Sequence, residues 1–263
     1  MESLEIPEKF VQYAKEIKAT IKNTVRFKLK PAIDLKIWQS KVGGIPYLPI
    51  EENYPCNDEQ IPLQFLIQIN FSEIPHLPGF PEKGILEFYV DSGDDLLGLD
   101  FNKPTHQNGF RVLYFNNVDE DESKLQKDVK TSVNEGKDYY GPISKGSEYS
   151  IEFFLEKQYI SGYDYRFPDL FCFASDDDML DEYNDIFPPN GHRLGGYAYF
   201  TQSDPREEQQ DLQEYELLLQ LDTDHSEGCD IMWGDTGVGA FFIKPDDLVK
   251  CDFSNVLYNW NSC

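Results

Sequence analysis

Short runs of apolar residues recur along most of the chain, with the length and composition of β-strands. Six of them are rich in β-branched or aromatic residues and are bounded by Gly, Pro, Asn or Asp: residues 65–69, 85–90, 110–115, 149–154, 217–221 and 240–243. An earlier run alternates Val25, Phe27 and Leu29 with basic residues, which predicts a half-buried strand. The pattern therefore predicts a mainly β fold.

Few segments have helical spacing. Phe10, Ala14, Ile17 and Ile21 recur at steps of four, three and four, which predicts an N-terminal helix over 7–22. Two short helices are expected over 122–134 and 176–186. We therefore divide the chain into an N-terminal helix with the first strand at 1–34, and a single mainly β domain at 35–263.

The chain contains an internal duplication. Three blocks recur in the same order: 40–47 resembles 192–199, 66–70 resembles 218–222, and 84–90 resembles 237–243. The spacing is also kept, because 24 residues separate Gly44 from Gln68 and the same number separate Gly196 from Gln220. We predict two β repeats, at about 40–90 and 192–243, that pack against each other and bury one shared core.

A glutamine stands at the same place in both repeats, Gln68 in one and Gln220 in the other. A glutamine inside an apolar run costs free energy unless its amide is hydrogen-bonded. One interpretation is that both amides bridge strands or fasten turns. The other is that both face one cleft between the repeats.

The repeated blocks also carry a family resemblance. Residues 40–49, 62–70, 192–197, 219–224 and 233–237 resemble the corresponding motifs of the YwqG-like bacterial family, and the resemblance extends over 35–263. It implies a mainly β, roll-like fold with internal repetition. The family is of unknown function, so the resemblance supplies no catalytic residues. Some members resemble components of toxin–immunity neighbourhoods, which implies a protein partner.

Charge narrows the classes of partner. The chain of 263 residues has 23 Lys and Arg against 48 Asp and Glu, a formal net charge of −25. Residues 1–42 carry +4 and the rest carries −29. An acidic body repels phosphate backbones, so we expect no nucleic-acid binding, and it attracts basic proteins. The simpler interpretation is that acidic residues keep the protein soluble.

Two segments carry candidate chemistry. Residues 222–230 contain carboxylates, an imidazole and a thiol, but Glu227 replaces the glycine of a calcium loop and no zinc spacing is present. A polar loop explains the segment, and we predict no metal or cofactor, although cation binding by the acidic loops stays open. Trp233 and Asp235 belong to a tight turn, or else form the aromatic wall and acceptor of a ligand pocket.

Compartment and membrane association follow from what the sequence lacks. It contains no apolar window of about 18 residues and no secretory signal pattern at its start. Its five cysteines are odd in number and form no C-x-x-C pair. We therefore expect a cytoplasmic protein without a membrane span.

Two functions remain as hypotheses. No nucleophile elbow, P-loop or dinucleotide fingerprint is present, which favours a non-enzymatic binding protein with an acidic, immunity-like surface for a basic partner. Acidic clusters at 91–95 and 176–185 are candidates for that surface. The alternative is a small-molecule-binding or enzymatic domain with its site between the repeats. That site would comprise Gln68, Gln220, Asp222, Trp233 and Asp235.

Overall fold

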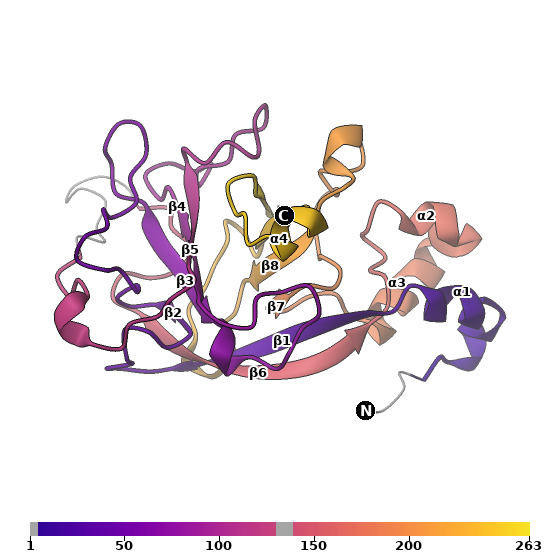
Figure 1. Ribbon diagram of the computed structural model, residues 1–263. Coiled ribbons are helices and arrows are strands. Elements are labelled where there is room, and N and C mark those ends of the chain that lie inside the picture. Colours follow the sequence, from indigo (N-terminus) through magenta and orange to yellow (C-terminus); the bar gives the residue numbers. More distant parts are fainter. Residues whose placement is uncertain (1–4, 130–138) are drawn as a thin grey trace.

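The computed structural model describes residues 5–129 and 139–263, and within them ten strands form one antiparallel sheet (Figure 1). The order across the sheet is β10-β9-β8-β7-β1-β6-β2-β3-β4-β5. In chain order the strands are β1 Lys22–Pro31, β2 Lys41–Gly43, β3 Gln64–Asn70, β4 Ile85–Val90, β5 Phe110–Phe115, β6 Glu148–Gln158, β7 Arg193–Leu194, β8 Glu216–Asp222, β9 Val238–Ile243 and β10 Leu257–Asn261. The predicted mainly β fold is confirmed.

The sheet consists of two units with the same topology. We call β2 to β5 the first unit and β7 to β10 the second unit; the long strands β1 and β6 lie between them and pair with each other from Lys22 to Pro31. Both units contain a register shift at the same place, between Phe65 and Ile67 in one and between Leu217 and Leu219 in the other. A shared irregularity is evidence of common construction, because bulges are specific features of a strand pair. The predicted duplication is confirmed, and each repeat extends one strand beyond the predicted bounds.

The two units enclose one apolar core. The rings of Phe88 in β4 and Phe241 in β9 lie 4.8 Å apart between centroids, and those of Phe110 in β5 and Tyr258 in β10 lie 5.1 Å apart. Because β5 and β10 are the two ends of the strand order, these ring contacts show that the sheet curls into a nearly closed barrel. Each unit therefore buries its apolar face against the other.

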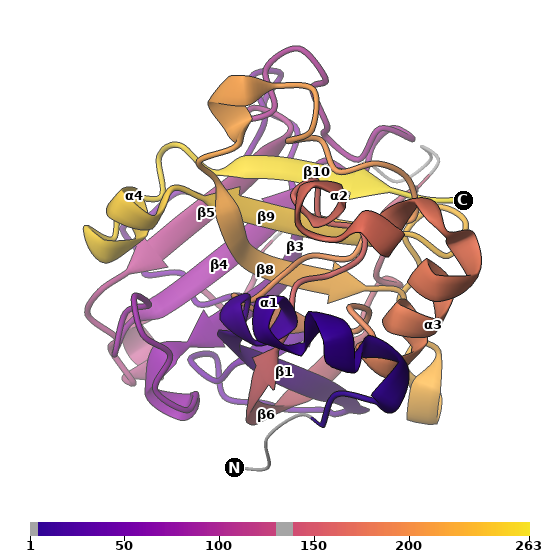
Figure 2. The same ribbon diagram turned by 90° about the vertical axis from the view of Figure 1, so that its right-hand side faces the viewer.

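Short helices cover one end of the barrel and make a second aromatic cluster (Figure 2). Phe10, Phe167, Phe173 and Tyr183 pack there, with Phe10 and Phe173 at 5.3 Å between ring centroids. The helices in the described residues are α1 Ala14–Ala19, α2 Phe167–Leu170, α3 Asp177–Ile186 and α4 Pro245–Val249, together with 3₁₀ turns at Glu8–Tyr13, Phe71–Glu73, Glu122–Lys124, Cys172–Ser175, Gln210–Leu212 and Ser226–Gly228. None of the helices described is long and apolar enough to cross a membrane.

The helix predictions are met to different degrees. The segment predicted as one helix over 7–22 is a 3₁₀ turn followed by α1, and β1 already begins at Lys22. The helix at 176–186 is confirmed as α3, whose N-cap Asp176 accepts a hydrogen bond from the backbone N–H of Met179. Of 122–134, only Glu122–Lys124 is helical, and 130–138 lie outside the described residues.

Candidate functional site

Gln68 fastens the two loops on either side of β2. Its side chain is fully buried; the Oε1 atom accepts a hydrogen bond from the backbone N–H of Tyr47 at 2.8 Å. The Nε2 atom donates to the carbonyls of Ile37 and Gln39, both at 2.7 Å. Backbone groups of these loops therefore satisfy the donors and the acceptor of the buried amide.

Gln220 makes the same set of bonds in the second unit. Its Oε1 atom accepts from the backbone N–H of Tyr199 at 2.8 Å, and its Nε2 atom donates to the carbonyls of Pro189 and Gly191 at 3.2 and 2.7 Å. The two glutamines thus act as equivalent turn fasteners, each within its own unit. This is the first of the two interpretations that the sequence allows.

Asp222 is a buried carboxylate that organises the turn before β7. Its Oδ2 atom accepts from the backbone N–H of Gly191 at 2.6 Å, and its Oδ1 atom accepts from that of Thr223 at 2.8 Å. Burial raises the pKa of Asp222, and these two backbone hydrogen bonds oppose the rise. The backbone N–H of Asp222 donates in turn to Nδ1 of His192 at 3.0 Å.

His192 has both ring nitrogens engaged. Its Nε2 atom lies 3.1 Å from Oδ2 of Asp224, and its ring stacks on Phe27 with centroids 5.3 Å apart. Because a backbone N–H can only donate, Nδ1 is the acceptor and Nε2 carries the proton toward Asp224. Burial favours the neutral form of Asp224, but the hydrogen bonds from His192 and Ser226 outweigh it and lower the pKa of that carboxyl. An imidazole held in this way orients the turn and has no free nitrogen for general-base chemistry.

The remaining two predicted residues direct their side chains elsewhere, although the backbone N–H of Trp233 donates to Oγ1 of Thr223 at 3.1 Å. Trp233 is fully buried in the core, where its indole lies directly over Gly239: a Cβ at that glycine would be 2.3 Å from the ring. Asp235 is exposed in the following turn. The structure therefore brings Gln220 and Asp222 together at Gly191, but it does not gather these two with Gln68, Trp233 and Asp235 in one site.

Asp222 does border a cavity, of about 670 Å³, beside β1. Its lining combines basic side chains of β1, Arg26, Lys28 and Lys30, with the carboxylates of Glu152, Asp222 and Asp224. The sequence analysis missed the contribution of β1. The available signal was the alternation of three basic residues in one strand of a strongly acidic chain.

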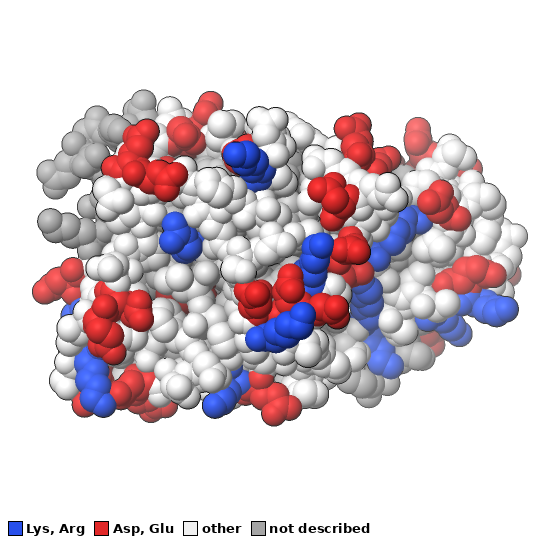
Figure 3. Space-filling model, turned by 45° about the horizontal axis from the view of Figure 1, so that its top comes forward, with Lys and Arg blue, Asp and Glu red and all other residues white. Residues whose placement is uncertain are grey.

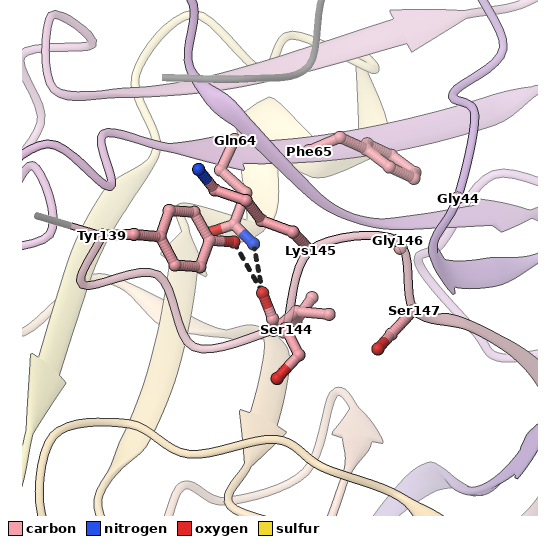
Figure 4. A pocket seen from close by; sticks show the side chains of 10 residues that line it. Gly44, Gln64, Phe65, Tyr139, Ser144, Lys145, Gly146 and Ser147 are labelled. Carbon is pink, nitrogen blue, oxygen red and sulfur yellow. Dashed lines mark hydrogen bonds between the residues drawn. The ribbon is translucent and has the colours of Figure 1, made fainter. Parts of the chain in front are cut away.

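Each double-glycine turn borders a hollow, and the two hollows occupy matched positions. The one at Gly43 and Gly44 measures about 110 Å³ and has a mixed polar and apolar lining; there, Gln64 Nε2 and Tyr139 OH both donate to the carbonyl of Ile143, at 3.0 and 2.6 Å (Figure 4). The other, at the Gly195–Gly196 turn, measures about 270 Å³. It is lined by Leu77 and Phe80 from the first unit and by Leu217 and Leu248 from the second.

A third kind of hollow, which we call the acidic hollow, measures about 370 Å³ and lies at the loop between β4 and β5. Four carboxylates line it, those of Glu59, Asp91, Asp94 and Asp100, and the lining residues that the structure describes include no Lys or Arg. Asp91 accepts from Asn57 Nδ2 at 2.8 Å and from the backbone N–H of Gly93 at 2.9 Å, so the loop holds the carboxylate in place.

Apolar side chains project beside the acidic hollow. Leu96, which lines the hollow, is 45% exposed. Phe101, the residue after Asp100 in the chain, is 68% exposed. Within the described part of the chain, no three His, Cys, Asp or Glu side chains are grouped so that they could hold a metal ion. The hollow therefore has carboxylates in its lining and exposed apolar side chains beside them.

Two fused β units around one core, with hollows at their loops, define a mainly β protein of duplicated construction. The chain belongs to the DUF1963 family, a domain of unknown function, whose family model matches residues 40–263. No curated protein matches the chain.

Proposed function

We propose that the protein is a non-enzymatic binding protein that receives a basic protein partner at the acidic hollow. The observation that carries the proposal is the set of four lining carboxylates, with no Lys or Arg among the lining residues of 5–129 and 139–263. Uncompensated carboxylates in a concave site attract a lysine or arginine side chain and speed its approach. Such capture of a basic protein is what an immunity-like role requires.

The surroundings of the hollow support a protein partner rather than a small cation. Leu96 and Phe101 are exposed large apolar side chains beside the carboxylates, and interfaces combine apolar anchors with a charged rim. Figure 3 shows clusters of acidic side chains scattered over one face of the molecule, with basic side chains between them. The net charge of −25 adds long-range attraction for the same class of partner.

The test compares two variants of equal charge. In the first, Glu59→Gln, Asp94→Asn and Asp100→Asn remove three carboxylates of the hollow. In the control, Asp177→Asn, Asp181→Asn and Asp185→Asn remove three exposed carboxylates of α3. Affinity for a panel of lysine- and arginine-rich peptides with one apolar anchor is measured by fluorescence anisotropy at several salt concentrations.

The proposal predicts that the hollow variant weakens the best peptide by at least about tenfold, a loss of about 1.4 kcal/mol, while the control changes it far less. Binding should also weaken with salt, since exposed charges are screened beyond about 10 Å at 0.1 M. Equal effects of the two variants would show that only net charge matters. Binding that is indifferent to salt would contradict the proposal.

A small-molecule site between the units is the second candidate, and one observation favours it. The hollow of about 270 Å³ at the Gly195–Gly196 turn is lined by apolar side chains of both units, among them Phe80 and Leu248. Apolar concave sites at such junctions are common ligand pockets. Fragment screening by NMR tests it: fragments that shift the amide signals of this turn, and lose that effect in Phe80→Ala, would support it.

We further infer that the protein is cytoplasmic and bacterial, within the narrower YwqG-like group. The inference is supported by the motif blocks at 40–49 and 192–197 and by the cysteine pattern, since the five cysteines are odd in number and form no C-x-x-C pair. Fractionation of cells that express the tagged protein tests the compartment directly.

A further inference from the structure

Two arginines face each other across the junction of β1 with the second unit. Arg26 of β1 is the direct cross-strand partner of Arg193 of β7. Arg193 is 3% exposed, and Arg26 is half-buried. Like charges placed opposite each other on neighbouring strands destabilise a sheet, so this pair requires compensation.

Hydrogen bonds within the protein do not compensate the charges of this arginine pair. Arg193 donates from Nη2 to the carbonyl of Asn190 at 2.6 Å, but its buried Nε has no hydrogen-bond partner. In residues 5–129 and 139–263, no carboxylate oxygen lies within 4.0 Å of either guanidinium. A buried donor left without an acceptor is costly, and more so when it is charged.

Another buried arginine of the same protein shows what full compensation looks like. Arg206 is 1% exposed, and its Nε and Nη2 atoms donate to both carboxylate oxygens of Asp204, at 2.9 and 2.6 Å. Its Nη1 atom donates to the carbonyl of Tyr215 at 2.9 Å. The fold thus provides acceptors for a buried guanidinium where its role is structural.

The matched position of the first unit is compensated as well. Lys41 of β2 stands where Arg193 stands in β7, and it is also fully buried. Its Nζ atom pairs with Oε1 of Glu148 at 3.4 Å. Of the two equivalent basic residues, the one in the second unit lacks such a contact.

Both arginines line a cavity of about 160 Å³ between β1, the end of β6 and the segment before β7. Its other lining residues are Thr24, Glu156, Lys157, Gln158, Tyr159, Ile186, Phe187 and Pro188. Burial, and next the neighbouring Arg26, lower the pKa of Arg193 to about 10, while the carboxylates of Asp222 and of Glu156, which also lines the cavity, oppose that change. At neutral pH the guanidinium is still charged, so the cavity has an electropositive wall.

We propose that Arg26 and Arg193 bind a small oxyanion, a phosphate or carboxylate group, in this cavity. A planar guanidinium presents its N–H groups in the geometry that carboxylate and phosphate oxygens accept, and Arg193 has its Nε–H free for that purpose. The volume holds about five water molecules at roughly 30 Å³ each, enough for one such group and no large ligand.

The experiment uses the full chain and two probes, inorganic phosphate and acetate, with sodium chloride at equal ionic strength as the reference. Thermal unfolding and titration calorimetry are measured with each probe. Ligand at a hundredfold excess over Kd stabilises the folded state enough to raise Tm by about 5 °C. A larger effect of phosphate than of acetate identifies the ligand group as phosphate, and the reverse order identifies it as carboxylate.

Variants locate the effect. Arg26→Gln and Arg193→Met should each weaken binding at least about tenfold, because each removes a charged donor, and Arg111→Gln on β5 should leave it unchanged. Because Arg26 is only half-buried, Arg26→Gln should still fold, and it decides the test if Arg193→Met does not fold. Probes that stabilise no more than sodium chloride, or a stabilisation that persists in Arg26→Gln, would overturn the proposal.

Discussion

The first and second units share a scaffold and differ in the chemistry built on it. Gln68 and Gln220 make matching hydrogen bonds to their turns. Both units also have a register shift two residues before the glutamine, at Leu66 and Leu218. On the same scaffold, Lys41 has a carboxylate within 4.0 Å and Arg193 has none among the described residues. Residues that fasten the backbone are thus repeated, whereas charged residues have diverged.

A second difference lies in the strands next to the glutamines. Glu87 of β4 pairs with Gln68, and Ala240 of β9 pairs with Gln220, so a buried carboxyl occupies one unit where the other has a methyl group. Glu87 accepts a hydrogen bond from the hydroxyl of Tyr89 at 2.7 Å. Opposite the glutamine, the first unit therefore has a buried polar side chain and the second unit an apolar one, which makes the two separable by experiment.

The largest expected effect comes from the contact that joins the units. Phe88→Ala and Phe241→Ala each open a cavity in the shared core and should cost about 4 kcal/mol of unfolding free energy. The double variant should cost less than the sum, because each ring packs on the other. Chemical denaturation of the four proteins checks this; strictly additive losses would mean that the rings do not depend on each other.

Removing the partner of Lys41 should have the next largest effect. Glu148→Gln leaves the buried ammonium without its carboxylate and should cost about 3 kcal/mol. The matched control is Glu156→Gln at the other end of β6, near Arg193, which breaks no direct ion pair of Arg193 and should cost less than about 1 kcal/mol. Denaturation midpoints measure both, and equal losses would contradict the contrast between the units.

The two glutamines should give nearly equal, intermediate losses. Gln68→Leu and Gln220→Leu each leave a backbone N–H without its acceptor and two carbonyls without their donor, at a cost of about 2 kcal/mol. The comparison of the two denaturation curves is the readout. A large loss in one unit and none in the other would show that the glutamines are not equivalent.

The smallest effect, counted per unit of pH, is a dependence on pH that belongs to the first unit. Burial raises the pKa of Glu87 to about 8, so the folded protein holds a proton that the unfolded chain releases near pH 4.5. Stability from this group is complete below pH 4.5 and falls by about 1.4 kcal/mol per pH unit as pH rises toward 8. Glu87→Gln should remove that slope, as measured by denaturation from pH 5 to 8, and Glu59→Gln, an exposed control, should keep it.

The sequence was sufficient to predict the internal duplication and insufficient to predict the candidate sites. Paired glycines and a buried glutamine at fixed spacing are demanded by backbone chemistry, so they recur visibly along the chain. Strand β7 has two residues and β10 alternates without strong flanking signals, so neither was predicted. The arginine pair was out of reach, because it depends on β1 lying beside β7, a pairing between segments about 170 residues apart.

The candidate site residues show the same limit. Trp233 and Asp235 belong to one short turn, yet the indole enters the core because Gly239 leaves room for it, while the carboxylate faces solvent. Local sequence states which residue types are near each other, and the packing of a distant strand decides which of them is buried. The acidic cluster at 91–95 was visible, but its concave shape comes from Glu59 on another loop.

Native-state hydrogen exchange of Phe88→Ala tests most directly whether the two units form one cooperative core. The account predicts that amides of β8 in the second unit lose as much protection as those of β3 in the first, because both strands bury their apolar faces in the same core. Full protection of β8 alongside weakened protection of β3 would show that the units unfold separately, and would contradict it.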